Sequence, residues 1–342
     1  MNLDKTNLTF VIVYLNSPPP EYTLENMRRL NRMFPNTKLV YVTNIPTVLP
    51  ANINAMIFEI PTEKYQSAFA AHSFNQRFRN GFWQTSLLRL IILSEIHAKL
   101  EGGPILHLEA DVMLMPNFPL SGFIKSRKLM WTTFNSEVDV AALLYSPNLE
   151  ATEFLSLKLL EMLALDPTLT DMKALARFRE QFTDKVTLLP SSDSDLTYHD
   201  FQCLFDGAIF GMWLLGQDQR NHFGRLVRFR DLQESKYKVG RKVVTYRDRS
   251  LRLSVDGKSS IPLVNLHVHC KDPRIFEMDD KLLEKRVKQS QSRFTLPIFS
   301  AKIFLELLLT AVKMGEVKSL LLHFPVIGRP LKFFRTFYTR SR

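Results

Sequence analysis

Two acidic side chains interrupt the most strand-like run of this sequence. The stretch GGPILHLEADVMLMPNFP, residues 102–119, is apolar on both sides of Glu109 and Asp111. Residues i and i+2 of a strand point to the same face, so we expect the two carboxylates to lie together. Oxygen ligands at a strand end suit Mg²⁺ or Mn²⁺. Both residues are therefore candidate metal ligands. The alternative is a strand-end turn in which Asp111 caps loop amides and Glu109 is solvated.

A second polar cluster lies in VNLHVHCKD, residues 264–272, which alternates polar and apolar residues as a strand does. The alternation predicts that His267 and His269 share a face, with Lys271 following them. Imidazole can bind Mn²⁺, and an ammonium group can neutralise a diphosphate. We favour His269 over His267 as a ligand because it lies nearer the strand end. The alternative is a histidine packed in the core and a solvated Lys271. Zinc is disfavoured because no Cys-x-x-Cys pair is present.

A third informative stretch, FDGAIFGMWLLG, begins at residue 205 and breaks an apolar run with three glycines. The glycines would allow another backbone to approach closely. Asp206 could hydrogen-bond the hydroxyl groups of a ligand or act as a general base. Its alternative role is to cap a helix N-terminus. Asp200 is a weaker candidate for the same catalytic role.

The order of apolar runs predicts an α/β fold. Strands are expected at 8–15, 38–44 and 53–61, and helices at 23–34, 81–103 and 151–167, so the chain opens with a β-α-β unit. Such units build a mostly parallel central sheet flanked by helices, which binds ligands at the carboxyl ends of its strands. We expect one domain over residues 1–275 and a helical, basic extension over 276–342.

Together these features resemble the GT-A nucleotide-sugar glycosyltransferases, a Rossmann-like fold. GGPILHLEADVML is similar to their Gly-Gly, apolar, Asp-x-Asp run, with Glu109 in place of the first Asp. The resemblance implies that Asp111 binds the metal directly and that Glu109 meets the ribose or binds the metal through water. HVHCK is similar to a late His-x-His-Ser-Lys run of some members, in which a His binds the metal and a Lys meets the diphosphate. Arg89 resembles a helix Arg beside the donor; its alternative is a surface charge.

Further donor contacts are expected only from their positions in the chain. Tyr14 and Asn16 follow the first strand, and Thr43 and Asn44 follow the second, where the resemblance places the nucleotide base. Trp83, at the start of the long helix, could stack on a sugar or base, or pack in the core.

The resemblance implies a hexosyltransferase-like enzyme, dependent on Mn²⁺ or Mg²⁺. It would move a sugar from a nucleoside diphosphate to the hydroxyl of a glycan or lipid-linked saccharide. One alternative is a nucleotidyltransferase acting on sugar phosphates. Such an enzyme would have a Gly-rich, Lys-bearing phosphate loop after the first strand, whereas this sequence has NSPPPEY there. The other is a glycan-binding module of the same fold without turnover.

The charge is concentrated at the C-terminus. The net charge of all 342 residues is +11, and residues 281–342 account for +10 of it. A nearly neutral body argues against nucleic-acid binding, whereas a basic tail suits an anionic membrane surface. Two cysteines and no apolar leader or span lead us to expect a cytoplasmic enzyme, peripheral at the inner face of a membrane. Bacterial surface-polysaccharide assembly is the expected setting.

Overall fold

The computed structural model describes residues 8–70, 81–100, 103–135, 137–216, 242–247, 250–255 and 260–294. The chain divides into two compact units, Met1–Ser292 and Arg293–Arg342. Nearly all of the second unit lies outside the described residues, and with it the basic tail beyond residue 294. The first part of the expected extension over 276–342, up to Ser292, belongs to the first unit. The fold described below is that of the first unit.

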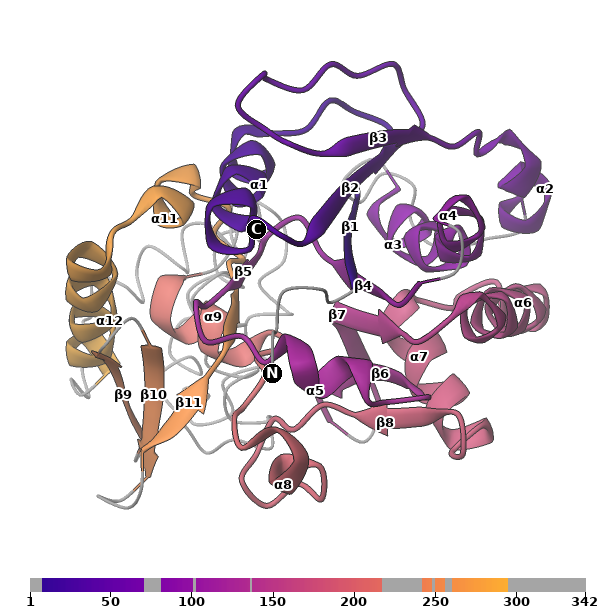
Figure 1. Ribbon diagram of the computed structural model, residues 1–342. Coiled ribbons are helices and arrows are strands. Elements are labelled where there is room, and N and C mark those ends of the chain that lie inside the picture. The colour runs from indigo at the N-terminus through magenta and orange to yellow at the C-terminus, as the bar shows by residue number, and fades with distance from the viewer. Residues whose placement is uncertain are drawn as a thin grey trace, which may run out of the picture. The chain divides into compact units, whose positions relative to one another are not determined.

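The first unit is built on a seven-stranded sheet with the order β3-β2-β1-β4-β7-β6-β8 (Figure 1). β7 runs antiparallel to β4 and β6, and the other pairs of this sheet are parallel. The expected mostly parallel α/β sheet is therefore confirmed. The strands are β1 Thr9–Val13, β2 Lys38–Thr43, β3 Met56–Glu59, β4 Ile105–Leu108, β6 Leu129–Thr133, β7 Asp139–Ser146 and β8 Val186–Leu188.

Helices cover both faces of this sheet (Figure 1). On one face pack α3 Phe82–Ile91, α4 Leu93–Lys99, α6 Leu149–Leu165 and α7 Asp171–Gln181. On the other lie α1 Glu21–Met33, α5 Leu120–Ile124 and α9 Ile209–Leu215. The remaining described helices are η1 Glu63–Tyr65, α2 Gln66–Phe69, α8 Tyr198–Phe201, α11 Pro273–Glu277 and α12 Asp280–Phe294. The long helix expected over 81–103 is broken at Ile92, which separates α3 from α4.

The two faces have separate hydrophobic cores, as the alternation of side chains along a strand requires. In β1, Phe10 and Ile12 join the core under α1, whereas Val11 and Val13 join the core under α3 and α6. Because β1 is buried on both faces, it is a continuous apolar run in the sequence.

A short second sheet joins two distant parts of the chain. β5 Val112–Leu114 pairs antiparallel with β12 Asn265–His267, and His267 lies opposite Val112. Nearby, β9 Lys242–Arg247, β10 Ser250–Val255 and β11 Ile261–Leu263 form a three-stranded antiparallel sheet. Residues 256–259, between β10 and β11, lie outside the described part of the chain.

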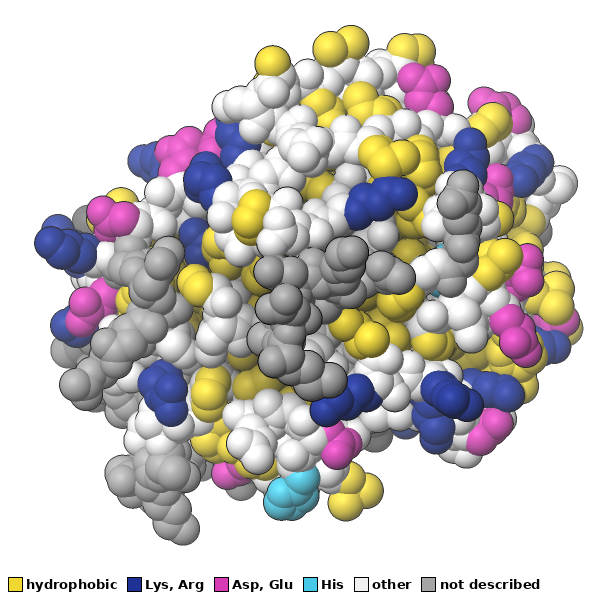
Figure 2. Space-filling model, viewed as in Figure 1, with side chains coloured by type: hydrophobic (Ala, Val, Ile, Leu, Met, Phe, Trp, Pro, Cys, Tyr) yellow, Lys and Arg dark blue, Asp and Glu magenta, His cyan; other side chains and the backbone are white. Residues whose placement is uncertain are grey.

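Acidic and basic side chains are interspersed on the face of the protein seen in Figure 2, without a large field of one sign. Within the described ranges, no helix is both long and apolar enough to cross a bilayer.

Candidate active site

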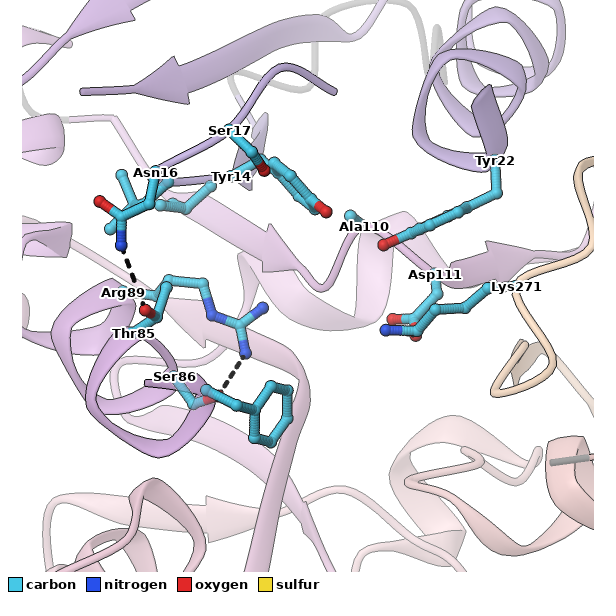
Figure 3. Close-up of a pocket in the computed structure, with 13 residues that line it drawn as sticks. Tyr14, Asn16, Ser17, Tyr22, Thr85, Ser86, Arg89, Ala110, Asp111 and Lys271 are labelled. Atoms are coloured by element: carbon cyan, nitrogen blue, oxygen red, sulfur yellow. Dashed lines mark hydrogen bonds and ion pairs between the residues drawn. The ribbon is translucent and has the colours of Figure 1, made fainter. Parts of the chain in front are cut away.

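A pocket of about 280 Å³ opens where the order of the strands reverses. β2 and β3 extend the sheet on one side of β1, and β4 lies on its other side. The loops after β1 and β4 diverge at such a point and leave a crevice at the carboxyl ends of the strands. The lining residues come from the loop after β1, from α1, α3 and the turn after β4, and from the segment after β12: Val13, Tyr14, Leu15, Asn16, Ser17, Tyr22, Phe82, Thr85, Ser86, Arg89, Ala110, Asp111 and Lys271 (Figure 3).

The two acids lie in a tight turn between β4 and β5, rather than on one face of a single strand. Glu109 donates its backbone N–H to Ala142 O at 3.0 Å, and Val112 donates to Glu109 O at 2.9 Å. The turn leaves both carboxylates directed toward the site. Both side chains face the same imidazole, that of His267.

The pairing of β12 with β5 brings His267 to this turn. Beyond the ladder, Val268 donates its backbone N–H to Asp111 O at 2.7 Å. The Nε2 atom of His267 lies 3.2 Å from Glu109 Oε2 and 3.2 Å from Asp111 Oδ1. Its Nδ1 atom lies 2.6 Å from Gly207 O, which fixes Nδ1 as the donor and turns Nε2 toward the carboxylates.

The three side chains fit a divalent cation. One ligand atom from each of Glu109, Asp111 and His267 lies within 4.8 Å of the other two. Adjacent ligands of an octahedral ion with bonds of about 2.1 Å lie about 3.0 Å apart, close to the 3.2 Å between Nε2 and each carboxylate. Two carboxylates and one imidazole suit Mg²⁺ or Mn²⁺, and the Gly207 carbonyl is the usual kind of support for a ligand histidine.

His269 does not join this cluster, although the sequence favours it over His267. β12 ends at His267, and the chain turns there instead of continuing as a strand. The His269 ring stacks on the ring of His267 with centroids 3.9 Å apart. Its Nε2 atom is buried and has no hydrogen-bond partner among the described residues. Burial and the neighbouring His267 charge hold the pKa of His269 well below its ordinary value.

The charges of the cluster reinforce one another. Burial alone would raise the pKa of Asp111, but Lys271 and His267 hold it well below its ordinary value. Burial alone would lower the pKa of His267, but Asp111 and Glu109 raise it to about 9. Asp111 is therefore an anion near neutral pH. In the absence of a metal, His267 carries a proton that a bound cation would replace.

Two basic side chains flank the acids on opposite sides. Arg89 Nη2 lies 2.7 Å from Glu109 Oε1, and 3.3 Å from Ser86 Oγ. Lys271 Nζ lies 3.4 Å from Asp111 Oδ2 and 5.5 Å from the centroid of the Tyr22 ring. In Figure 3, Lys271 and Asp111 lie side by side at the edge of the pocket, and Arg89 enters from α3. Both cations are placed to meet an anion in the pocket.

Asp206 is buried behind His267 and does not line the pocket. Its carboxylate accepts backbone N–H groups from Phe210 at 2.9 Å, Gly211 at 2.7 Å and His267 at 3.0 Å. Two of these donors belong to α9, so the side chain has the helix-capping contacts that the sequence left as an alternative to a base. The third donor ties α9 to β12. Gly211 allows this contact, because a Cβ there would come within 1.8 Å of His267 O.

The other expected site residues are divided between the pocket and its surroundings. Tyr14 and Asn16 line the pocket. Asn44 does not, but it exchanges hydrogen bonds with Asn16, donating Nδ2 to Asn16 Oδ1 at 2.8 Å and accepting the Asn16 N–H at 2.7 Å. Thr43 is buried at the end of β2. Asp200 is exposed on α8, outside the pocket lining.

Several residues of the site carry little signal in the sequence. Tyr22, Ser17, Thr85 and Ser86 line the pocket from loop or helix positions that resemble ordinary surface. Asp171, at the start of α7, is buried, and its Oδ1 atom lacks a hydrogen-bond partner within the described part of the chain. Burial and the charge of Glu109 raise its pKa to about 6, although Arg89 opposes the shift. Trp83 lies outside the lining, edge-to-face on Phe82.

Solved structures with a similar fold include glycosyltransferases. An active-site mutant of LgtC is 16% identical and aligns over 56% of this chain and 82% of its own, with a TM-score of 0.38. Core-mannan synthase A from Aspergillus fumigatus, in a Mn/GDP form, is 10% identical over 54% and 73%, with a TM-score of 0.37. The glycosyltransferase GlyE from Streptococcus pneumoniae is 12% identical over 85% and 65%, with a TM-score of 0.41.

No protein family and no curated sequence matches the chain. All three TM-scores lie below 0.5, and the function proposed below therefore depends on this chain's own side chains.

Proposed function

We propose that this protein is a metal-dependent glycosyltransferase that uses a nucleoside diphosphate sugar as donor. The observation that carries the proposal is the convergence of Glu109, Asp111 and His267 on one point beside Lys271, at the edge of the pocket. Two anions, one imidazole and one ammonium group around a single point are suited to hold a divalent cation and a diphosphate together.

Each residue has a defined task in this proposal. Asp111, Glu109 and His267 would hold Mn²⁺ or Mg²⁺, which when bound supplies positive charge to the diphosphate. Arg89 orients the Glu109 carboxylate through their ion pair. Lys271 neutralises charge that develops on the leaving diphosphate as its bond to the sugar C1 breaks. The acceptor oxygen forms the new bond to C1 and passes its proton to solvent water, while the diphosphate leaves with the electrons of the broken bond.

The pocket walls suit the nucleoside part of such a donor. The rings of Tyr14, Tyr22 and Phe82 offer faces for stacking, and the hydroxyls of Ser17 and Thr85 offer hydrogen bonds. The Tyr14 and Tyr22 hydroxyls point into the pocket in Figure 3. We further propose that the donor carries a hexosyl group. The acceptor would be a glycan or a lipid-linked saccharide, such as a bacterial surface polysaccharide under assembly. Supporting the lipid-linked acceptor is the basic composition of residues 281–342, suited to the anionic inner face of a membrane.

The proposal is tested with a panel of nucleotide sugars, assayed for release of nucleoside diphosphate with Mn²⁺, with Mg²⁺ and with EDTA. Wild type is compared with Asp111→Asn and with Asp184→Asn, a carboxylate 74% exposed at its side chain. We expect one donor to be hydrolysed slowly, activity to require metal, and only Asp111→Asn to abolish it. Addition of lipid-linked saccharides and anionic vesicles should then accelerate release.

The alternatives predict other results. A nucleotidyltransferase would release pyrophosphate from a nucleoside triphosphate and a sugar phosphate instead. A glycan-binding module would bind a saccharide without any turnover. If wild type bound neither metal nor nucleotide in calorimetry, the acid cluster would be structural and the proposal would be wrong.

A further inference from the structure

Asn26 is a buried polar side chain that contacts the acid turn from a different element. It belongs to α1, is fully buried, and is flanked on its helix by the apolar core residues Met27 and Leu30. Asn is a weak helix former, because its amide competes for backbone hydrogen bonds, and a buried amide must also find partners. A local choice this unfavourable indicates a role outside the helix.

The partners of Asn26 are the two carbonyls on either side of Asp111. Its Nδ2 atom donates to Ala110 O at 3.1 Å and to Val112 O at 2.9 Å. Both amide hydrogens are used, which is the full donor capacity of the group. The amide thereby fixes the Ala110–Asp111 peptide unit and the Val112–Met113 peptide unit. On the opposite side, Asp111 O accepts the N–H of Val268, so the backbone of the turn is held from two elements.

We propose that Asn26 is a positioning residue for the cation site, setting its metal affinity by holding both carbonyls that flank Asp111. The inference rests on the proposed function of that site as a metal centre. Asn26 neither lines the pocket nor supplies a ligand atom, so it acts through the turn that carries Asp111. Groups that orient metal ligands typically contribute 10- to 100-fold to metal affinity.

The same helix ties this support to the pocket wall. Tyr22 lies one turn before Asn26, on the same face of α1, and it lines the pocket. The Lys271 ammonium lies over the Tyr22 ring and also faces Asp111. A displacement of α1 therefore moves the pocket wall and the acid turn together.

The test is a Mn²⁺ titration of the full chain, with free Mn²⁺ followed by electron paramagnetic resonance. Asn26→Leu keeps the volume of the side chain and removes both donors. The matched control is Asn31→Leu, because Asn31 also lies on α1 but exchanges its hydrogen bonds with Asn54. We expect roughly 10- to 100-fold weaker Mn²⁺ binding in Asn26→Leu and wild-type binding in Asn31→Leu.

Equal affinity in Asn26→Leu and wild type would overturn the inference and leave the proposed function standing. Absence of Mn²⁺ binding in wild type would instead remove the proposed function. If Asn26→Leu does not fold, the wild-type protein labelled at Asn decides: Mg²⁺ should shift the Asn26 side-chain amide signals and slow their exchange with solvent. Signals unchanged by saturating Mg²⁺ would contradict the inference.

Discussion

Gly211 of α9 lies against the backbone of His267 in β12, and a Cβ on Gly211 would come within 1.8 Å of the His267 carbonyl oxygen. Backbone cannot move aside as a flexible side chain can. We therefore expect Gly211→Ala to push α9 away from β12 and to displace His267 from the acid turn. Overpacking of this kind costs about 1–3 kcal/mol, and a clash with backbone belongs at the upper end.

This prediction is checked by urea unfolding and by Mn²⁺ titration of the same samples. Both the free energy of unfolding and the metal affinity should fall in Gly211→Ala. Met212→Leu, a volume-conserving change on the same helix, should cost less than about 1.5 kcal/mol and keep the metal affinity. A Gly211→Ala variant as stable as wild type would show that α9 and β12 are less closely packed than described.

Asp206→Asn separates a structural role from a catalytic one. The carboxylate accepts three backbone N–H groups, and an amide can present only one oxygen to them. Leaving a buried donor unpaired costs about 1–3 kcal/mol, so we expect lower stability and weaker Mn²⁺ binding. Asp193→Asn, on an exposed loop, is the control. Normal stability and metal affinity together with lost turnover would instead identify Asp206 as the general base.

Lys271→Met should separate diphosphate binding from metal binding. The ammonium group lies 3.4 Å from Asp111 Oδ2, at the edge of the pocket. Its removal takes a cation away from the diphosphate and leaves the acid cluster more negative. We expect about 10-fold weaker binding of a nucleoside diphosphate, which is about 1.4 kcal/mol, with unchanged or tighter Mn²⁺ binding. Calorimetry measures both, and Lys185→Met, at an exposed position, should change neither.

The raised pKa of Asp171 predicts how the stability of the fold depends on pH. Burial and the charge of Glu109 raise the pKa of Asp171 to about 6 from an ordinary 3.8. The folded chain therefore binds this proton more tightly than the unfolded chain, and stability falls as the pH rises from about 4 to about 6. We expect Asp171→Asn to be more stable than wild type by about 2 kcal/mol at pH 7, after allowing for the lost helix-terminus interaction.

The measurement is urea unfolding of both proteins between pH 4 and pH 7. The advantage of Asp171→Asn should shrink toward pH 4, where the wild-type carboxyl is neutral in the folded chain and partly protonated in the unfolded chain. Asp184→Asn should show no such trend, because its carboxylate is exposed. An advantage that stays constant with pH would contradict the raised pKa.

The elements of the sheet could be predicted from the sequence because their signals are local. A buried parallel strand such as β1 is a continuous apolar run, and α1 has apolar residues at helical spacing. The acids of the turn stand out for the same reason, as charges within an apolar run. The break at Ile92 between α3 and α4 has no Gly or Pro to announce it.

The composition of the site depends on pairing between distant segments, which a local pattern does not contain. The choice between His267 and His269 follows from the register of β12 against β5 and from the end of that ladder at His267. Asn26 and Asp171 are polar residues in amphipathic helices, and polar residues of such helices are usually solvated. The one available signal for Asn26 is its place on the apolar face shared by Met27 and Leu30.

The ladder between β5 and β12 also determines when the site comes into being during folding. Glu109 and Asp111 leave the ribosome long before His267 and Lys271, and the pair of acids has no imidazole to face until the later segment docks. Contacts between segments so far apart in sequence form slowly, because the intervening loop must first be closed. A cation that binds only the docked state would stabilise the product of this late step and so favour the complete fold by mass action.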